Sequence, residues 1–210
     1  MKTEEEILKL FEAQNELNRM TISDNWLETK KDWTVPIMVE SAELIESLDW
    51  KWWKKGEDNI ENAKMELIDI LFFSLSHFYK VRYSYVEAPT SYGIKQFDRK
   101  AIIYSIKLLS RYVLNPHSLE YIDNVFDEIF LTGSLLGMSE DEIFKLYYAK
   151  HTLNVFRLKN GYKDGTYQKI IDGKEDNAHL MEMMTHMEFD SDFKDKLYEK
   201  FKDFYFSHID

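Results

Sequence analysis

Two neighbouring predicted helices each carry a pair of acidic side chains, and this pattern constrains the chain more than any other feature. Residues 37–79 read as two helices joined by a short polar turn. Glu40 and Glu43 lie three residues apart on the first helix, and Glu66 and Asp69 lie three apart on the second. Residues with this spacing share a helix face. The second pair is embedded in an almost wholly apolar run, which is typical of a helix in a protein interior.

Four acids placed in this way need compensation. An unpaired buried ion costs several kcal/mol, whereas a whole domain has a net stability of only about 5–15 kcal/mol. The carboxylates must therefore be protonated, paired with lysines or bound to cations. Oxygen ligands on two helices suit hard divalent ions, Mg²⁺ first. The alternative is a solvated groove or ion pairs with Lys51, Lys54 and Lys64; two pairs together favour the metal site.

The composition predicts an all-α protein. The chain has seven Gly and three Pro in 210 residues, and apolar residues recur at spacings of three and four almost everywhere. We expect a helical bundle built on the two antiparallel helices that carry the acids, with a helical C-terminal part. The length fits one domain over residues 1–210.

Charge and residue usage exclude several classes of protein. The net charge of −11 argues against bulk electrostatic binding of nucleic acid or of an anionic membrane. The chain has no Cys for a disulfide, a thiolate nucleophile or a zinc–thiolate site, and its six His show no ligand spacing. The acidic N-terminus has no signal-peptide core, and no apolar run approaches the roughly 20 residues that cross a bilayer. We expect a cytoplasmic protein.

The pattern of caps and apolar residues predicts the helix bounds. Pro36 suits the first turn of the second helix, which is expected to run into the segment Trp50–Lys54. Asp58 and Glu61 are placed as a start signal for the third, and Ser139 with Glu142 forms a capping-box pattern. The predicted helices cover residues 4–20, 36 into the segment 50–54, 60–82, 98–114, 118–136, 143–160, 178–187 and 192–206, with a polar turn at 54–59 between the second and the third.

Polar residues in three places are candidates for ligand binding. Gln14 and Asn18 fall on the apolar stripe of the first helix, so they either make core hydrogen bonds or read the edge of a ligand such as a nucleobase. Trp53, in a run of three Trp and two Lys, is either an anchor at a helix end or a partner for a ring. Phe73 lies four residues after Asp69 and would extend the acidic face into an aromatic wall.

A third polar face lies near the C-terminus. Lys150, Asn154 and Arg157 have the spacing of one helix face, and the turn at residues 160–167 follows with another Lys and free backbone N–H groups. Such a set can grip a polyphosphate. The alternative is a solvated basic stripe in an otherwise acidic chain.

Together these pieces resemble the dimeric, all-α dUTPase family. The matching stretches are E-S-A-E-L-I-E-S-L-D-W-K-W-W-K at 40–54, M-E-L-I-D at 65–69, K-H-T-L-N-V-F-R-L-K-N-G-Y-K-D-G-T-Y at 150–167 and G-K-E-D-N at 173–177. The paired acids alone are shared with the wider all-α nucleoside triphosphate pyrophosphatases. The resemblance does not extend with any specificity to residues 83–135.

The resemblance implies an Mg²⁺-dependent hydrolase that converts dUTP, and also dUDP, to dUMP and works as a homodimer. Glu40, Glu43, Glu66 and Asp69 would hold two or three Mg²⁺ ions. Glu43 and Glu40 would be the catalytic carboxylates, and Glu43 would orient or deprotonate the attacking water. Uracil would contact Gln14, Asn18 and Trp53, and Phe73 would approach the base or sugar. Deoxyribose and phosphates would contact Lys150, Asn154, Arg157, Asn160, Tyr162 and Lys163, and Lys169 and Asn177 would help to close over them.

Two other functions compete with this one. The same chemistry on dCTP or on a broader range of nucleotides is the first, since an amide can satisfy either uracil or cytosine by flipping. The second is a non-enzymatic helical module for protein interaction whose acids are simply solvated.

Overall fold

The computed structural model describes residues 4–82, 89–115 and 120–209, and it confirms the all-α prediction. Helices dominate these residues, and the only strands among them are two residues long. In chain order the elements are α1 (Glu4–Thr21), a 3-10 turn η1 (Trp26–Glu28), α2 (Thr34–Glu46), α3 (Ile60–Arg82), α4 (Arg99–Leu114), α5 (Glu120–Leu135), α6 (Glu140–Lys159), β1 (Ile170–Ile171), β2 (Lys174–Glu175), α7 (Asp176–Thr185) and α8 (Phe193–His208).

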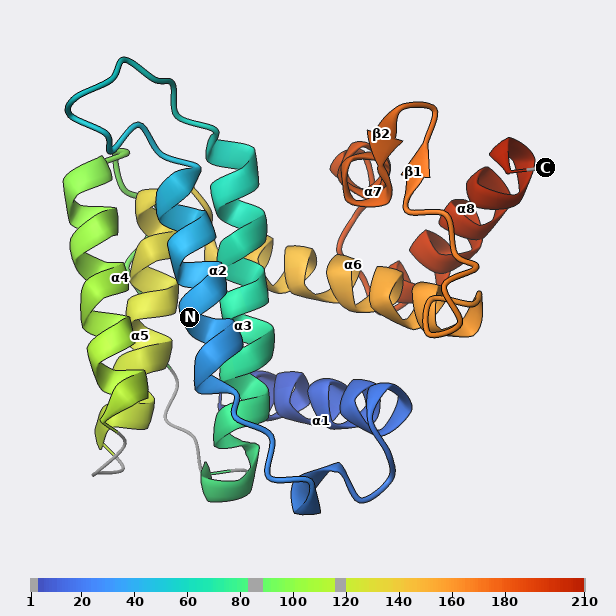
Figure 1. Ribbon diagram of the computed structural model, residues 1–210, viewed down its shortest axis with the longest axis horizontal. Coiled ribbons are helices and arrows are strands. Elements are labelled where there is room, and N and C mark those ends of the chain that lie inside the picture. Colours follow the sequence, from blue (N-terminus) through green and yellow to red (C-terminus); the bar gives the residue numbers. More distant parts are fainter. Residues whose placement is uncertain (1–3, 83–88, 116–119, 210) are drawn as a thin grey trace.

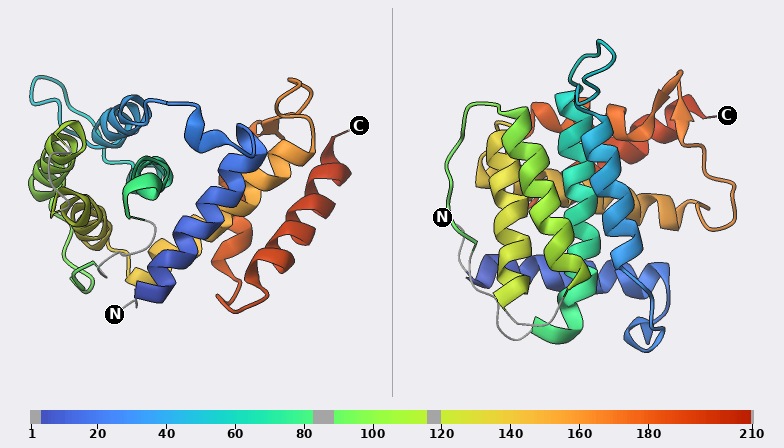
Figure 2. Two further views of the ribbon diagram at one scale, coloured as in Figure 1. Left: turned by 90° about the horizontal axis from the view of Figure 1, so that it is seen from below. Right: turned by 60° about the vertical axis from the view of Figure 1, so that its left-hand side comes forward.

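The helices form two groups that cross at a steep angle (Figure 1). Helices α2 to α5 run up and down beside one another and are seen end-on in the left view of Figure 2. Helices α1, α6 and α8 lie alongside one another across one side of that group, with α6 in contact with both of its neighbours. None of the described helices combines the length and the apolar character that crossing a membrane would need.

Helix α3 is the centre of the molecule, as its apolar sequence predicted. It contacts α1, α2, α5 and α6. Its side chains are buried on nearly every side because each neighbour covers a different face. The buried apolar residues of α3 are Ala63, Met65, Leu67, Ile68, Ile70, Leu71, Phe72, Leu75, Phe78 and Tyr79. They belong to one apolar cluster that extends from α1 to α8.

The prediction that the second helix continues into the Trp-rich segment is wrong. Helix α2 ends at Glu46, and residues 47–59 form a loop before α3. The Ser47 hydroxyl bonds the Glu43 carbonyl (2.9 Å), and the Asp58 carboxylate accepts the Asp49 N–H (2.8 Å) and a two-pronged contact from Arg99 of α4. These contacts hold the chain out of helical geometry.

The start of α3 also differs by one residue from the expected signal. Asn59, and not Asp58, accepts the N–H of Asn62 through its side chain (3.1 Å). The capping box of Ser139 and Glu142 is confirmed, and it begins α6 three residues earlier than residue 143. The predicted start of the fifth helix at Ser118 lies outside the described residues.

A short antiparallel ribbon precedes α7 and was not predicted. Ile170 pairs with Glu175 and Ile171 with Lys174. Asp172 and Gly173 form the turn with φ of 48° and 77°, and two positive φ values in a two-residue hairpin turn favour an Asp-Gly sequence. The ribbon lies beside α7 (Figure 1).

Candidate active site

A cleft of about 980 Å³ lies between α2 and α3 on one side and α6, the ribbon and α7 on the other. This volume is near the upper end of the range for small-ligand sites, about 300–1,000 Å³. One wall is acidic, and the other carries most of the cations. Eleven of the sixteen residues predicted for the site line it: Glu40, Glu43, Glu66, Asp69, Phe73, Lys150, Asn154, Arg157, Tyr162, Lys169 and Asn177.

The acidic wall forms because α2 and α3 pack together along their length. Carboxylate oxygens of Glu40, Glu43 and Glu66 all lie within 4.8 Å of one another. Oxygens that share one Mg²⁺ ion lie about 3–4 Å apart, as follows from Mg–O bonds of about 2.1 Å. The donor set therefore fits a hard divalent cation after small side-chain rotations. Among the described residues no histidine joins this cluster.

These acids are less deeply buried than the apolar sequence suggested. Glu43 is exposed, while Glu40, Glu66 and Asp69 are half-buried on the wall of an open cleft. Their crowding still matters. Partial burial and the charges of Asp69, Glu43 and Glu66 raise the pKa of Glu40 to about 8. Burial and the Asp69 charge also raise the pKa of Glu66, and the nearby Lys150 opposes this rise. The cluster therefore holds a proton at neutral pH unless a cation takes its place.

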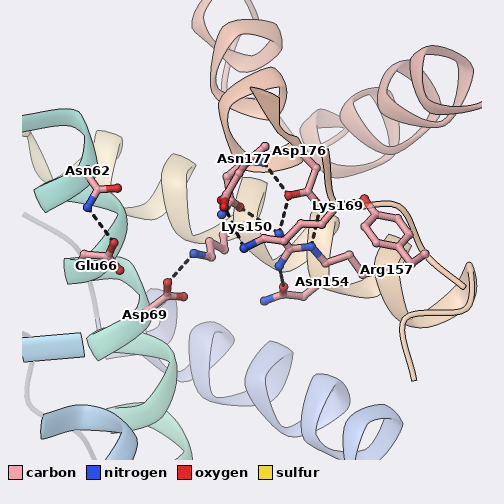
Figure 3. A network of polar contacts seen from close by, with 11 residues as sticks. Asn62, Glu66, Asp69, Lys150, Asn154, Arg157, Lys169, Asp176 and Asn177 are labelled. Atoms are coloured by element: carbon pink, nitrogen blue, oxygen red, sulfur yellow. Dashed lines mark hydrogen bonds and ion pairs between the residues drawn. The ribbon is translucent and has the colours of Figure 1, made fainter. Parts of the chain in front are cut away.

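Asp69 is engaged with the opposite wall. Its carboxylate lies 2.5 Å from the ammonium group of Lys150, which projects from α6 across the cleft (Figure 3). Both groups are poorly exposed, with side chains 21% and 6% accessible. Asp69 is thus paired with Lys150 and is not one of the three residues whose oxygens converge.

Asn62 adds a contact that the sequence did not single out. Its side-chain amide donates to Glu66 (2.9 Å) and to the Ser47 hydroxyl (2.7 Å). Asn62, one turn before Glu66 on the same helix, thereby orients the Glu66 carboxylate (Figure 3). The spacing of four residues between an amide and an acid on a helix was a signal that could have predicted it.

The opposite wall carries the predicted face of α6. Arg157 donates from Nε and Nη2 to the two carboxylate oxygens of Asp176 (2.7 and 2.6 Å). Its Nη1 lies 3.3 Å from the Asn154 side-chain oxygen, and its guanidinium lies over the Tyr162 ring at 5.7 Å. Lys169 and Asn177 extend this wall from the ribbon and α7 (Figure 3).

Residues 163–209 thus complete the cleft. Lys174, Glu175, Ala178 and Met181 line it although the sequence did not mark them as site residues. Asp176 is wholly buried behind the wall, where the Tyr167 hydroxyl also donates to it (2.8 Å). Burial and the Asp176 charge raise the pKa of Tyr167, so the phenol keeps its proton. The partners of Asp176 in these contacts lie 9 and 19 residues away along the chain, so no local sequence pattern predicts them.

Gln14 and Asn18 lie outside the cleft, in the core. Their amides share the Ser76 hydroxyl as acceptor, at 3.0 and 2.9 Å, and the Tyr147 hydroxyl donates to Gln14 (3.2 Å). Both side chains are 3–4% exposed. The structure therefore shows the core hydrogen bonds that were one of the two alternatives, and contact with uracil stays a prediction.

Three further predicted residues do not line the cleft. Trp53 is 58% exposed beside Trp50 and Trp52 on the α2–α3 loop. Asn160 donates to the Phe156 carbonyl (2.8 Å) at the end of α6, and Lys163 donates to the Met20 carbonyl (2.7 Å) at the end of α1. Their roles toward substrate likewise stay predictions.

The fold and the cleft define a class: an all-α protein in which a cluster of carboxylates, close enough together to suit a divalent cation, faces a wall of cationic side chains. A family model described as dUTPase matches residues 6–162. The chain belongs to this all-α dUTPase family, whose members hydrolyse dUTP and use divalent metal ions. No curated protein matches the sequence. The family match sets aside the non-enzymatic interaction module.

Proposed function

We propose that this dUTPase uses Mg²⁺ and accepts dUDP as well as dUTP, giving dUMP with phosphate or pyrophosphate. Such an activity limits dUTP and supplies dUMP for dTMP synthesis. The observation that supports the proposal best is the convergence of Glu40, Glu43 and Glu66 within 4.8 Å, opposite a wall with Lys150 and Arg157. A triphosphate and a carboxylate cluster repel each other, so divalent cations must separate them.

The carboxylates would hold two or three ions. Glu40, Glu43 and Glu66 already converge, and Asp69 would join them once Lys150 moves to a phosphate. Bound there, the ions offset phosphate charge and lower the pKa of water. The raised pKa of Glu40 supports this assignment, because a cation would replace the proton that the crowded acids otherwise retain.

The side chains divide the remaining work. Glu43 is exposed to the cleft, where water reaches it, and we assign it the orientation and deprotonation of the attacking water, with Glu40 beside it. Glu43 would take a proton from water as the water oxygen bonds to one of the two phosphorus atoms of the α–β bridge. The bridging P–O bond would break, and dUMP and pyrophosphate would separate. The phosphates and the deoxyribose contact residues of α6, the following turn and the ribbon: Lys150, Asn154, Arg157, Asn160, Tyr162, Lys163, Lys169 and Asn177.

Uracil would lie at the end of the cleft near Phe73, which is half-buried against Trp33 (6.1 Å between rings). Gln14, Asn18 and Trp53 would reach the base after local rearrangement. We also propose that residues 1–210 act as one domain, because residues 169–181 complete the wall that α6 begins. We further propose that two copies form a homodimer. The exposed apolar stripe of Val35, Met38 and Val39 on α2, beside the acids, supports an interface there.

Turnover of dUTP, dUDP, dCTP and dTTP with and without Mg²⁺ tests the proposal. We expect dUMP release from dUTP and dUDP only with Mg²⁺, and loss of turnover in Glu43→Ala and Asp69→Ala. Glu46→Gln is the matched control, since Glu46 lies on α2 three residues after Glu43 but bonds Trp50 and Lys51 outside the cleft. Near-normal rates in Glu43→Ala, or equal use of dCTP, would contradict the assignment.

A further inference from the structure

Asp176 sits behind the cationic wall and has every acceptor position filled. Its two oxygens receive Arg157 Nε (2.7 Å), Arg157 Nη2 (2.6 Å), the Tyr167 hydroxyl (2.8 Å) and the N–H of Asn177 (2.9 Å). The residue is 0% exposed, so it cannot touch a ligand in the cleft. Two-pronged contacts between Arg and a carboxylate fix the plane of the guanidinium as well as its position.

The contacts leave one edge of Arg157 toward the cleft. Nε and Nη2 are committed to Asp176, while Nη1 has only the longer contact to Asn154 (3.3 Å). The side chain is 10% exposed and lines the cleft, with the Tyr162 ring against the guanidinium. Figure 3 shows Arg157 held between Asp176 on one side and Asn154 on the other. An unpaired Arg at this depth would be unfavourable.

We propose that Asp176, braced by Tyr167, is a positioning residue that fixes Arg157 for the phosphate chain of the substrate. The inference rests on the proposed role of Arg157 in phosphate binding. Asp176 cancels part of the long-range attraction of Arg157, so its benefit is geometric: an oriented donor needs no rearrangement when charge moves along the phosphates. The brace comes from residues 167 and 176, after the part of the chain that the family model matches.

A double-mutant cycle measures this coupling. The variants are Arg157→Ala, Asp176→Asn and the combination, with kcat and KM for dUTP measured separately at saturating Mg²⁺. Asp176→Asn keeps the shape of the side chain but turns an N–H₂ group toward the guanidinium. We expect kcat/KM to fall roughly tenfold, the scale of one charge-assisted hydrogen bond, and to fall no further than about twofold when Arg157 is already Ala. Tyr167→Phe removes only the brace and is expected to lower kcat/KM about threefold.

A structural role alone predicts a different result. Asp176 would then lower kcat/KM by the same factor with or without Arg157, and that additivity overturns the inference. Unchanged kcat/KM in a folded Asp176→Asn, judged by its circular dichroism and Tm, overturns it as well. If Asp176→Asn does not fold, Tyr167→Phe decides by the same cycle with Arg157→Ala.

Asp58→Asn is the matched control. Asp58 makes the same two-pronged contact with Arg99 (2.9 and 2.6 Å), and neither residue lines the cleft. It should lower Tm and leave kcat/KM unchanged, and a loss in kcat/KM as large as that of Asp176→Asn would count against the inference. Absence of Mg²⁺-dependent turnover in the unmodified protein would instead reject the proposed function. The two failures are therefore distinguishable.

Discussion

The ammonium group of Lys150 on α6 lies 2.5 Å from a carboxylate oxygen of Asp69 on α3, so two residues 81 positions apart join the walls of the cleft. Without an added cation, Lys150 is the positive charge nearest to the crowded acids. The Lys150 ammonium group therefore offsets part of the negative charge that we propose Mg²⁺ neutralises. Under the proposed function, binding of a nucleotide with its metal would free Lys150 to turn to a phosphate and Asp69 to turn to the metal.

Lys150→Met tests this exchange. Removing one partner of a buried pair costs about 3–5 kcal/mol, and because Asp69 keeps some solvent contact we expect about 1–3 kcal/mol. At roughly 2–4 °C per kcal/mol for a chain of this size, Tm in EDTA should fall by about 2–12 °C. Mg²⁺ should raise Tm more in this variant than in the unmodified protein, because Asp69 is free to bind it, and turnover should fall.

The control for this prediction is Lys64→Met. Lys64 lies on the same helix as Asp69 but pairs with the exposed Glu61 (2.8 Å). Its loss should change the free energy of unfolding by less than about 0.5 kcal/mol, the scale of a surface pair, and should therefore leave Tm nearly unchanged. An equal Mg²⁺-induced rise in Tm for Lys150→Met and the unmodified protein would show that Asp69 is not a ligand.

The pKa of Glu40 predicts how stability without metal depends on pH. The group titrates near 8 in the folded chain and near 4.5 in the unfolded chain, so the folded state retains a proton that the unfolded state has released. Stability in EDTA must then fall as pH rises through this window. The window from pH 7 to 8.5 covers this titration and lies above the pKa of the buried His77 and His151, which burial lowers below 6.5.

Thermal melts at pH 7.0 and 8.5 check the sign. We expect a lower Tm at the higher pH in EDTA, a larger Mg²⁺-induced rise in Tm at that pH, and a much smaller pH dependence in Glu40→Gln. A Tm in EDTA that rises from pH 7.0 to 8.5 would contradict the crowding of these acids.

Asn18 lies in the core, so its proposed contact with uracil needs a direct test. We expect Asn18→Ala to weaken inhibition of dUTP turnover by dUMP more than inhibition by inorganic pyrophosphate. Ser76→Ala is the control, because it removes the shared acceptor and leaves both amides in place. Both variants should lower the free energy of unfolding by about 1 kcal/mol, seen as a lower Tm. If dUMP and pyrophosphate weaken equally in Asn18→Ala, the amide serves the core alone.

Two glycines in the turn after α6 offer a matched pair. Gly161 and Gly165 both have positive φ, 89° and 71°, where an L side chain costs about 1–2 kcal/mol. A Cβ on Gly161 would also lie 1.9 Å from the Thr166 hydroxyl, whereas a Cβ on Gly165 would meet nothing within 4 Å. Gly161→Ala should therefore lower Tm at least twice as much as Gly165→Ala. It should also lower kcat/KM, because the turn carries Tyr162 into the cleft.

The sequence predicted the parts of this molecule that depend on local patterns. The apolar surround of α3 and the capping box at Ser139 follow from residues within one or two turns, and both agree with the structure. The convergence of the paired acids follows from helix geometry, once two helices are known to be neighbours in space. The family resemblance supplied the cationic wall, which spacing alone did not distinguish from a solvated stripe.

The sequence could not predict contacts between distant segments. The end of α2 depends on the loop contacts of Asp58 with Asp49 and Arg99, which no helix propensity encodes. The partner of Asn18 is 58 residues away, and the partner of Arg157 lies beyond a hairpin turn. The pairing of Asp69 with Lys150 depends on how α6 crosses the bundle.

Two separate parts of the chain supply the two chemically different sides of the cleft. The carboxylates come from residues 40–69, whereas the support of Arg157 and the outer wall come from residues 163–181, after the stretch that the family model matches. If the tail that follows α6 contacts the phosphates as we propose, changes in it are expected to alter the preference for diphosphate or triphosphate without disturbing the acids. Selection for altered nucleotide use in the laboratory should accumulate its first substitutions there.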